Sequence, residues 1–197
     1  MYKFRFSNIS QFGGRARALS GIIPKAPMQM LFLCTDNNHL SRFAEEYFNY
    51  QIRARSDRFL TGTTETAETA ETLTAQQTLL KNRIRPWTAF SAGLARDIMP
   101  KSPDRISLDT QKALMNLGIK PCRRWPVSAR NVHFTTADLI YAVDKKQHLP
   151  MVNEYFANHA YKVKYLIGDM HKGSNSRITF EQMVKAIDSV IDEIVSM

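Results

Sequence analysis

The sequence predicts an α/β fold of three layers, α/β/α, around a central, mostly parallel sheet of four strands. Short apolar runs alternate with longer segments of helical periodicity along most of the chain, which is the order typical of βαβ units. The chain also has 197 residues, of which 44% are hydrophobic. A chain of this length and composition is able to bury the core of a single domain.

The first half of the pattern begins with an apolar run over 28–33, which predicts a buried strand. A polar stretch follows, and then a helical pattern from 41 to about 53. A second short strand is predicted over 87–91. Ligands of parallel sheets bind outside the carboxyl ends of the strands, so we expect the site where these strands end.

The second half continues the alternation. A helix is predicted over 106–117, with an apolar face and Gly118 as its stop, followed by a weak strand around 122–125. Strands are then predicted over 138–143 and 162–167, with a helix over 145–156 between them. Apolar residues at helical spacing predict a last helix over 180–195.

Two segments stand apart from this pattern, so the predicted domain covers 28–197. Residues 1–27 hold five Lys or Arg and no acid, and therefore form a basic N-terminal extension. A flexible tail, a targeting peptide and translated upstream sequence are all open interpretations of it. Residues 56–86 include a Thr/Ala/Glu tract, which we interpret as an insertion after the first helix.

Composition limits the setting and the partners. The net charge of +9 favours acidic partners, but no set of basic and aromatic residues typical of nucleic-acid binding is evident, so nucleic acid is not favoured. The chain has two cysteines, Cys34 and Cys122, which indicates a reducing compartment, and we expect a cytoplasmic protein. No apolar run is long enough to span a bilayer.

Cys34 is the first candidate for chemistry. It closes the strand over 28–33 and opens a polar loop that leads directly into a helix. Free backbone N–H groups and the helix dipole stabilise negative charge at such a position. The segment therefore combines a stabilised thiolate with a cradle for an anion.

The segment from Leu31 to Glu45 resembles the active-site loop of the low-molecular-weight protein tyrosine phosphatases. That family has an apolar strand, then Cys, five residues, Arg, Ser, commonly Pro, and an Ala-Glu pair. The matching positions hold Cys34, Asn37, Ser41, Ala44 and Glu45, whereas the Arg and Pro positions hold Leu40 and Arg42.

Further partial motifs follow in the order of the family. Phe90-Ser91-Ala92-Gly93 is similar to its Ser-Ala-Gly turn. The strand ending at Asp144, with His148 after it, is similar to the family's fourth strand and the polar corner beside the site. Asp169-Met170 stands where the family has the Asp-Pro of its acid loop.

The resemblance implies a role for each matching residue. Cys34 would be the nucleophile and Asp169 the general acid. Ser41 would hydrogen-bond the thiolate, and Asn37 would hold the loop in its tight shape, because Asn tolerates left-handed backbone conformations. The implied phosphate-binding residues are Asn37, Asn38, His39 and Ser41. The implied substrate is a phosphorylated protein or a small phosphomonoester, hydrolysed with no metal and no cofactor.

In the family, the guanidinium of the loop arginine binds two phosphate oxygens, and Leu40 stands at that position. Losing two charge-assisted hydrogen bonds of about 1.5–3 kcal/mol each lowers the rate by roughly two to four orders of magnitude. Asp36 adds a carboxylate beside a dianion. His39, Arg42 or a basic residue from elsewhere in the chain could supply the missing cation. Arg42 lies about 200° around the helix, so we expect it to point elsewhere, at the surface.

Three functions are compatible with this sequence. The first is a weakened phosphomonoesterase, and the second is an inactive phosphatase-like module that binds phosphorylated or acidic partners. The third is an arsenate reductase on the same fold. A relay through three cysteines needs two thiols besides Cys34, and the chain has only Cys122, which argues against the third function.

Overall fold

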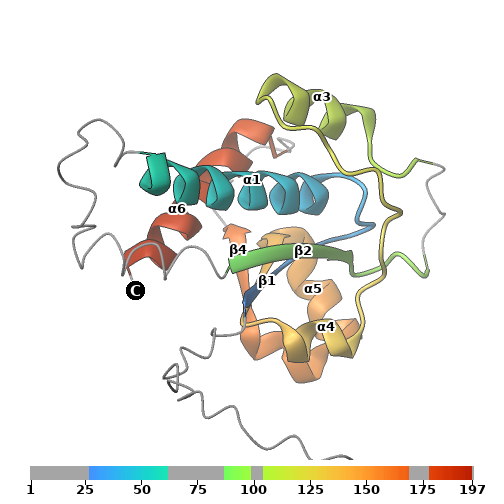
Figure 1. The fold of residues 1–197 in the computed structure, drawn as a ribbon. Helices are drawn as coiled ribbons and strands as arrows, with labels where there is room; N and C mark the ends of the chain where they lie inside the picture. Colours follow the sequence, from blue (N-terminus) through green and yellow to red (C-terminus); the bar gives the residue numbers. More distant parts are fainter. Residues whose placement is uncertain (1–26, 62–86, 99–103, 169–177, 197) are drawn as a thin grey trace, which may run out of the picture.

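The computed structural model describes residues 27–61, 87–98, 104–168 and 178–196 (Figure 1). The basic extension, most of the insertion and Asp169 lie outside these residues. The predictions made for them therefore stay predictions.

The central sheet has four strands, all parallel to their neighbours, in the order β2-β1-β3-β4. The strands are β1 (Met28–Cys34), β2 (Trp87–Gly93), β3 (Leu139–Asp144) and β4 (Val163–Ile167). The predicted α/β fold class is confirmed, and the described sheet is entirely parallel. All four carboxyl ends therefore lie along the same edge.

The helices of the described residues are α1 (Leu40–Thr61), α3 (Leu108–Asn116), α4 (Asn131–Thr136), α5 (Lys145–Tyr155), α6 (Phe180–Ser196) and a short 3-10 helix (Ala157–Lys162). Helix α1 continues past residue 53, where the sequence predicted its end. The sequence did not predict α4 and the 3-10 helix, because six residues are too few to show a helical period. None of the described helices is long and apolar enough to cross a membrane.

Strand β1 shows how the three layers form. Its side chains alternate between the two faces of the sheet. Met30, Phe32 and Cys34 join the core beneath α1 and α6, whereas Leu31 and Leu33 join the core beneath α4 and α5. Figure 1 shows the corresponding helix layers on opposite sides of the sheet. Burial of both faces explains why the sequence of this strand is continuously apolar, and it places Cys34 on the side of α1.

The strand predicted around 122–125 is wrong. Residues 121–125 have no strand assignment, and the segment between α3 and α4 makes one β-bridge, between Gly93 and Ser128. The Cys122 N–H donates to the Glu46 carboxylate at 3.1 Å, and the Cys122 carbonyl accepts from Arg42 at 2.7 Å. Because side chains of α1 satisfy these backbone groups, the segment has no need of a strand partner.

Gly93 allows the loop after β1 to lie close to the end of β2. A Cβ atom at this position would come within 2.8 Å of the backbone carbon of Asp36. We expect Gly93→Ala to lower the free energy of unfolding by about 1–3 kcal/mol, because one of the two backbones must move. Gly168→Ala is the matched control, since a Cβ there meets nothing within 4 Å. Urea denaturation of both variants checks this, and equal stabilities would contradict the close contact.

Candidate active site

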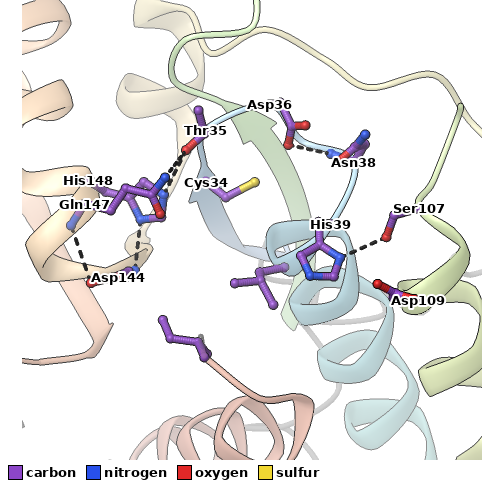
Figure 2. A pocket seen from close by; sticks show the side chains of 12 residues that line it. Cys34, Thr35, Asp36, Asn38, His39, Ser107, Asp109, Asp144, Gln147 and His148 are labelled. Carbon is purple, nitrogen blue, oxygen red and sulfur yellow. Dashed lines mark hydrogen bonds between the residues drawn. The ribbon is translucent and has the colours of Figure 1, made fainter. Parts of the chain in front are cut away.

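The side chain of Cys34 faces a cleft of about 520 Å³ at the carboxyl edge of the sheet. In Figure 2 Cys34 lies between residues of the start of α5 on one side and His39 with the start of α3 on the other, and its sulfur points away from α5. Twelve residues line this cleft: Cys34, Thr35, Asp36, Asn38, His39, Leu40, Ser107, Asp109, Asp144, Gln147, His148 and Ile178. The cleft thus lies where a parallel sheet places its ligands.

The loop after β1 is shaped by hydrogen bonds to Cys34 and Asn37. The Cys34 sulfur lies 2.9 Å from the Ser41 hydroxyl oxygen and accepts from the Asn37 N–H at 3.3 Å. Asn37 is the one non-glycine residue with positive φ, 62°, in the described chain. Its buried side chain donates to Ser41 at 3.0 Å and to Ser91 at 2.7 Å. The thiol contact of Ser41 and the left-handed Asn37, both implied by the resemblance, are present.

Arg124, which was not identified from the sequence, binds this loop through the Asn37 side chain. Nη1 of Arg124 donates to the Asn37 side-chain oxygen at 3.3 Å. Nη2 of Arg124 donates to the Ser91 hydroxyl at 3.0 Å and to the Glu45 carboxylate at 2.5 Å. The Val127 N–H also donates to Asn37, at 2.8 Å. Arg124 and Asn37 are 87 positions apart, so no local spacing signalled their contact.

The charge of the cleft opposes an anion. Three carboxylates, Asp36, Asp109 and Asp144, are among the lining residues, and the described lining includes no Lys or Arg. One oxygen of the Asp144 carboxylate caps α5, where it accepts a hydrogen bond from the Lys146 N–H at 2.9 Å. Leu40 lines the cleft where the resemblance places an arginine, and packs against the apolar core.

The candidate replacement cations have hydrogen-bond partners within the protein. His39 faces the cleft, and its Nδ1 lies 2.8 Å from the Ser107 hydroxyl and 2.9 Å from the Thr110 hydroxyl. Arg42 points away from the cleft, but it is fully buried, so its expected surface position is wrong. It donates to Glu46 and to the Cys122 carbonyl. Nη1 of Arg96 reaches the loop only at the Asp36 carbonyl, at 3.4 Å.

The electrostatics of Cys34 differ from the sequence expectation of a stabilised thiolate. Burial raises the pKa of the Cys34 thiol above its usual value, and the nearby Asp36 carboxylate raises it further. Hydrogen bonds with Ser41 and Asn37 act in the opposite direction, without outweighing burial. The sulfur is therefore held in position by the Asn37 N–H and by its hydrogen bond with the Ser41 hydroxyl, while its surroundings favour the neutral thiol.

No family model and no curated protein sequence matches the chain. Several solved structures are similar to it. Low-molecular-weight protein tyrosine phosphatases from T. tengcongensis and Streptococcus pyogenes are 20% and 15% identical to it, with TM-scores of 0.51 and 0.53. The alignments cover 86% of this chain in both cases, and 95% and 91% of those chains. YfkJ from Bacillus subtilis is 16% identical with a TM-score of 0.55, over 87% of this chain and 94% of that one.

The chain has the fold of the low-molecular-weight protein tyrosine phosphatases. Within that fold Cys34 ends β1, Asn37 and His39 lie in the loop after it, and Ser41 lies in the first turn of α1. Asn38 also lines the cleft, with its N–H donating to the Asp36 side chain at 3.3 Å. Asp169 follows the last described residue after β4, so its role as the acid stays a prediction. Within the described residues, no group of His, Cys, Asp and Glu side chains is arranged to hold a metal ion.

His148 forms part of the cleft wall as a neutral imidazole. It is 1% exposed, and its Nδ1 accepts from the Asp144 N–H at 2.9 Å, so the ring proton is on Nε2. Nε2 lies 3.4 Å from the Thr35 hydroxyl, which also accepts from Gln147 at 3.0 Å. Burial lowers the pKa of His148 to about 4, against a weaker raising effect of Asp144. This side chain therefore joins the start of α5 to the loop beside Cys34 without adding a positive charge.

We expect His148 to make the fold sensitive to acid. Its folded pKa of about 4 is below its unfolded value, so the unfolded state binds more protons between pH 6.5 and 4, and stability is lost as the pH falls through that window. The loss from this group is about 3 kcal/mol. His148→Asn keeps an acceptor for the Asp144 N–H and removes the titration. Urea denaturation at pH 7, 6, 5 and 4 should show a smaller loss in the variant, and parallel curves would contradict the assignment.

Proposed function

We propose that the chain is a low-molecular-weight protein tyrosine phosphatase-like hydrolase of phosphomonoesters, in which Cys34 is the nucleophile and Asp169 the general acid. The observation that carries the proposal is the position of the Cys34 sulfur at a cleft, held by the Ser41 hydroxyl and the Asn37 N–H. A structural cysteine has no need of donors aimed at its sulfur, whereas a thiolate nucleophile depends on them.

The reaction proceeds in two displacements. The Cys34 thiolate attacks phosphorus, the bond to the ester oxygen breaks, and Asp169 donates its proton to that leaving oxygen. The Asp169 carboxylate then takes a proton from water, whose oxygen attacks phosphorus. The sulfur–phosphorus bond breaks, which releases phosphate and restores the thiolate. In the proposal, Asn37, Asn38, His39 and Ser41 bind or position the phosphoryl group.

The proposed enzyme is slow with ordinary phosphotyrosine. Leu40 supplies neither charge nor hydrogen-bond donor to the phosphoryl oxygens. The carboxylates of Asp36, Asp109 and Asp144 repel a dianion in the same cleft. The raised pKa of Cys34 also lowers the fraction of thiolate at neutral pH. All three effects act on the charge of the site, while the hydrogen bonds that shape the loop are present.

A second candidate function is an inactive phosphatase-like module that binds phosphorylated or acidic partners. The absence of Lys and Arg from the described lining favours loss of turnover. The three carboxylates argue against strong binding of an acidic partner in the cleft itself. The hydrolase would turn over phosphomonoesters through the Cys34 sulfur, whereas the binding module would show no turnover.

Hydrolysis of p-nitrophenyl phosphate tests the proposal. We expect slow turnover by the natural chain and none by Cys34→Ser. Leu40→Arg should raise kcat/KM by roughly two to four orders of magnitude, because it restores two charge-assisted hydrogen bonds. Leu40→Met is the matched control, since it changes neither charge nor volume much, and it should leave the rate near that of the natural chain.

A comparison of two substrates tests the role of Asp169. Asp169→Asn should slow the hydrolysis of phenyl phosphate, whose leaving oxygen needs a proton, more than the hydrolysis of p-nitrophenyl phosphate.

A natural chain that is inactive until Leu40 is replaced by Arg supports the binding module. Turnover that persists in Cys34→Ser would refute Cys34 as the nucleophile, and a Leu40→Arg variant no faster than Leu40→Met would refute the account of the slow rate.

A further inference from the structure

A second hollow lies beside the start of α3, and we call it the Trp125 hollow. Its volume is about 330 Å³, and its lining consists of Asp104, Arg105, Ile106, Gln111, Arg123 and Trp125. It shares no lining residue with the Cys34 cleft. Two segments form it, 104–111 and 123–125, so that Arg105 from the first lies near Arg123 and Trp125 from the second.

The groups around the Trp125 hollow hold one another in position. The Arg105 guanidinium carbon lies 4.8 Å from the centre of the Trp125 ring, in a cation–π contact. Nη1 of Arg105 donates to the Arg123 carbonyl at 3.1 Å, which ties the two segments together. The Gln111 side chain donates to the Ile106 carbonyl at 2.9 Å. The Arg105 guanidinium therefore lies over one face of the indole in an ordered position.

The backbone on both sides of Trp125 is anchored. Arg124 binds Glu45 and Asn37, and the Val127 N–H binds Asn37. Trp125 itself is 54% exposed. An exposed indole on an anchored backbone is a preformed stacking surface, because little conformational entropy is lost when a planar group packs on it.

The charge of this hollow is opposite to that of the Cys34 cleft. Arg105 and Arg123 face one carboxylate, Asp104, whereas the cleft has three carboxylates and no described Lys or Arg. Arginine recognises phosphate through its planar fork, and tryptophan stacks with aromatic rings. The volume is at the lower end of the range of small-molecule pockets, about 300–1,000 Å³.

We propose that the Trp125 hollow binds an aromatic phosphate, a planar ring that stacks on Trp125 and carries a phosphoryl group bound by Arg105 and Arg123. A nucleotide and a phosphotyrosine side chain share this chemistry. The site is independent of the proposed hydrolysis at Cys34, since none of its residues lines that cleft.

The two tryptophans of the chain, Trp87 and Trp125, allow a test with an internal control. The indole N–H resonances of the ¹⁵N-labelled Cys34→Ser chain, which is used to prevent turnover, are followed during titration with AMP and, separately, with O-phospho-L-tyrosine. At least one ligand should shift the Trp125 resonance saturably while Trp87 stays fixed. The ligand that acts identifies the source of the aromatic phosphate. Adenosine and inorganic phosphate should each bind at least about tenfold more weakly, because each lacks half of the recognition.

Variants assign the binding to the hollow. Arg105→Gln and Arg123→Gln should each weaken binding about tenfold, whereas Lys120→Gln and Arg130→Gln, exposed basic residues outside the lining, should leave it within about twofold. A Trp125 resonance unmoved by both ligands at millimolar concentration would overturn the proposal. So would equal binding of inorganic phosphate, or equal losses in the two pairs of variants. Because Cys34→Ser is used throughout, failure of this test leaves the proposed hydrolysis untouched.

Discussion

The side chain of Asn37 joins the loop after β1 to the rest of the domain. It donates to Ser41 and Ser91 and accepts from Arg124 and Val127, while its own backbone takes the left-handed conformation. Few residues other than glycine adopt that conformation without cost, and Asn is the commonest of them. The turn brings the Asn37 N–H to the Cys34 sulfur. The direction of the Cys34 side chain therefore depends on contacts with α1, with β2 and with the segment before α4.

Shape and charge are separate properties of this site. The hydrogen bonds that shape the loop come from Asn37, Ser41 and Ser91, with the Arg124–Glu45 ion pair behind them. None of these depends on a cation within the cleft. The described arginines near the loop, Arg42, Arg96 and Arg124, lie outside the cleft lining, and Arg42 and Arg124 are paired with Glu46 and Glu45. The described contacts of the loop are therefore compatible with a leucine at position 40.

The sequence predicted the parallel sheet and the position of Cys34 because both follow from local patterns. A doubly buried strand is continuously apolar, and a strand end before a helix places a side chain at the edge of the sheet. Contacts between distant residues left no such pattern. Arg124 is 87 positions from Asn37 and was assigned no role from the sequence; Arg105 and Trp125 gave no joint signal. The strand around 122–125 was predicted wrongly because side chains of α1 satisfy its backbone groups.

We infer that the loop after β1 has the shape of a phosphate-binding loop, while its described cleft lining lacks Lys and Arg. The rate at which iodoacetamide alkylates Cys34, followed by mass spectrometry as a function of pH, tests it most directly. The exposed Cys122 serves as the reference in the same molecule. We expect the midpoint for Cys34 to lie above the ordinary cysteine value of about 8.5 in the natural chain and to fall in Leu40→Arg. A midpoint well below that value in the natural chain would contradict the claim, because a cation would then already be stabilising the thiolate.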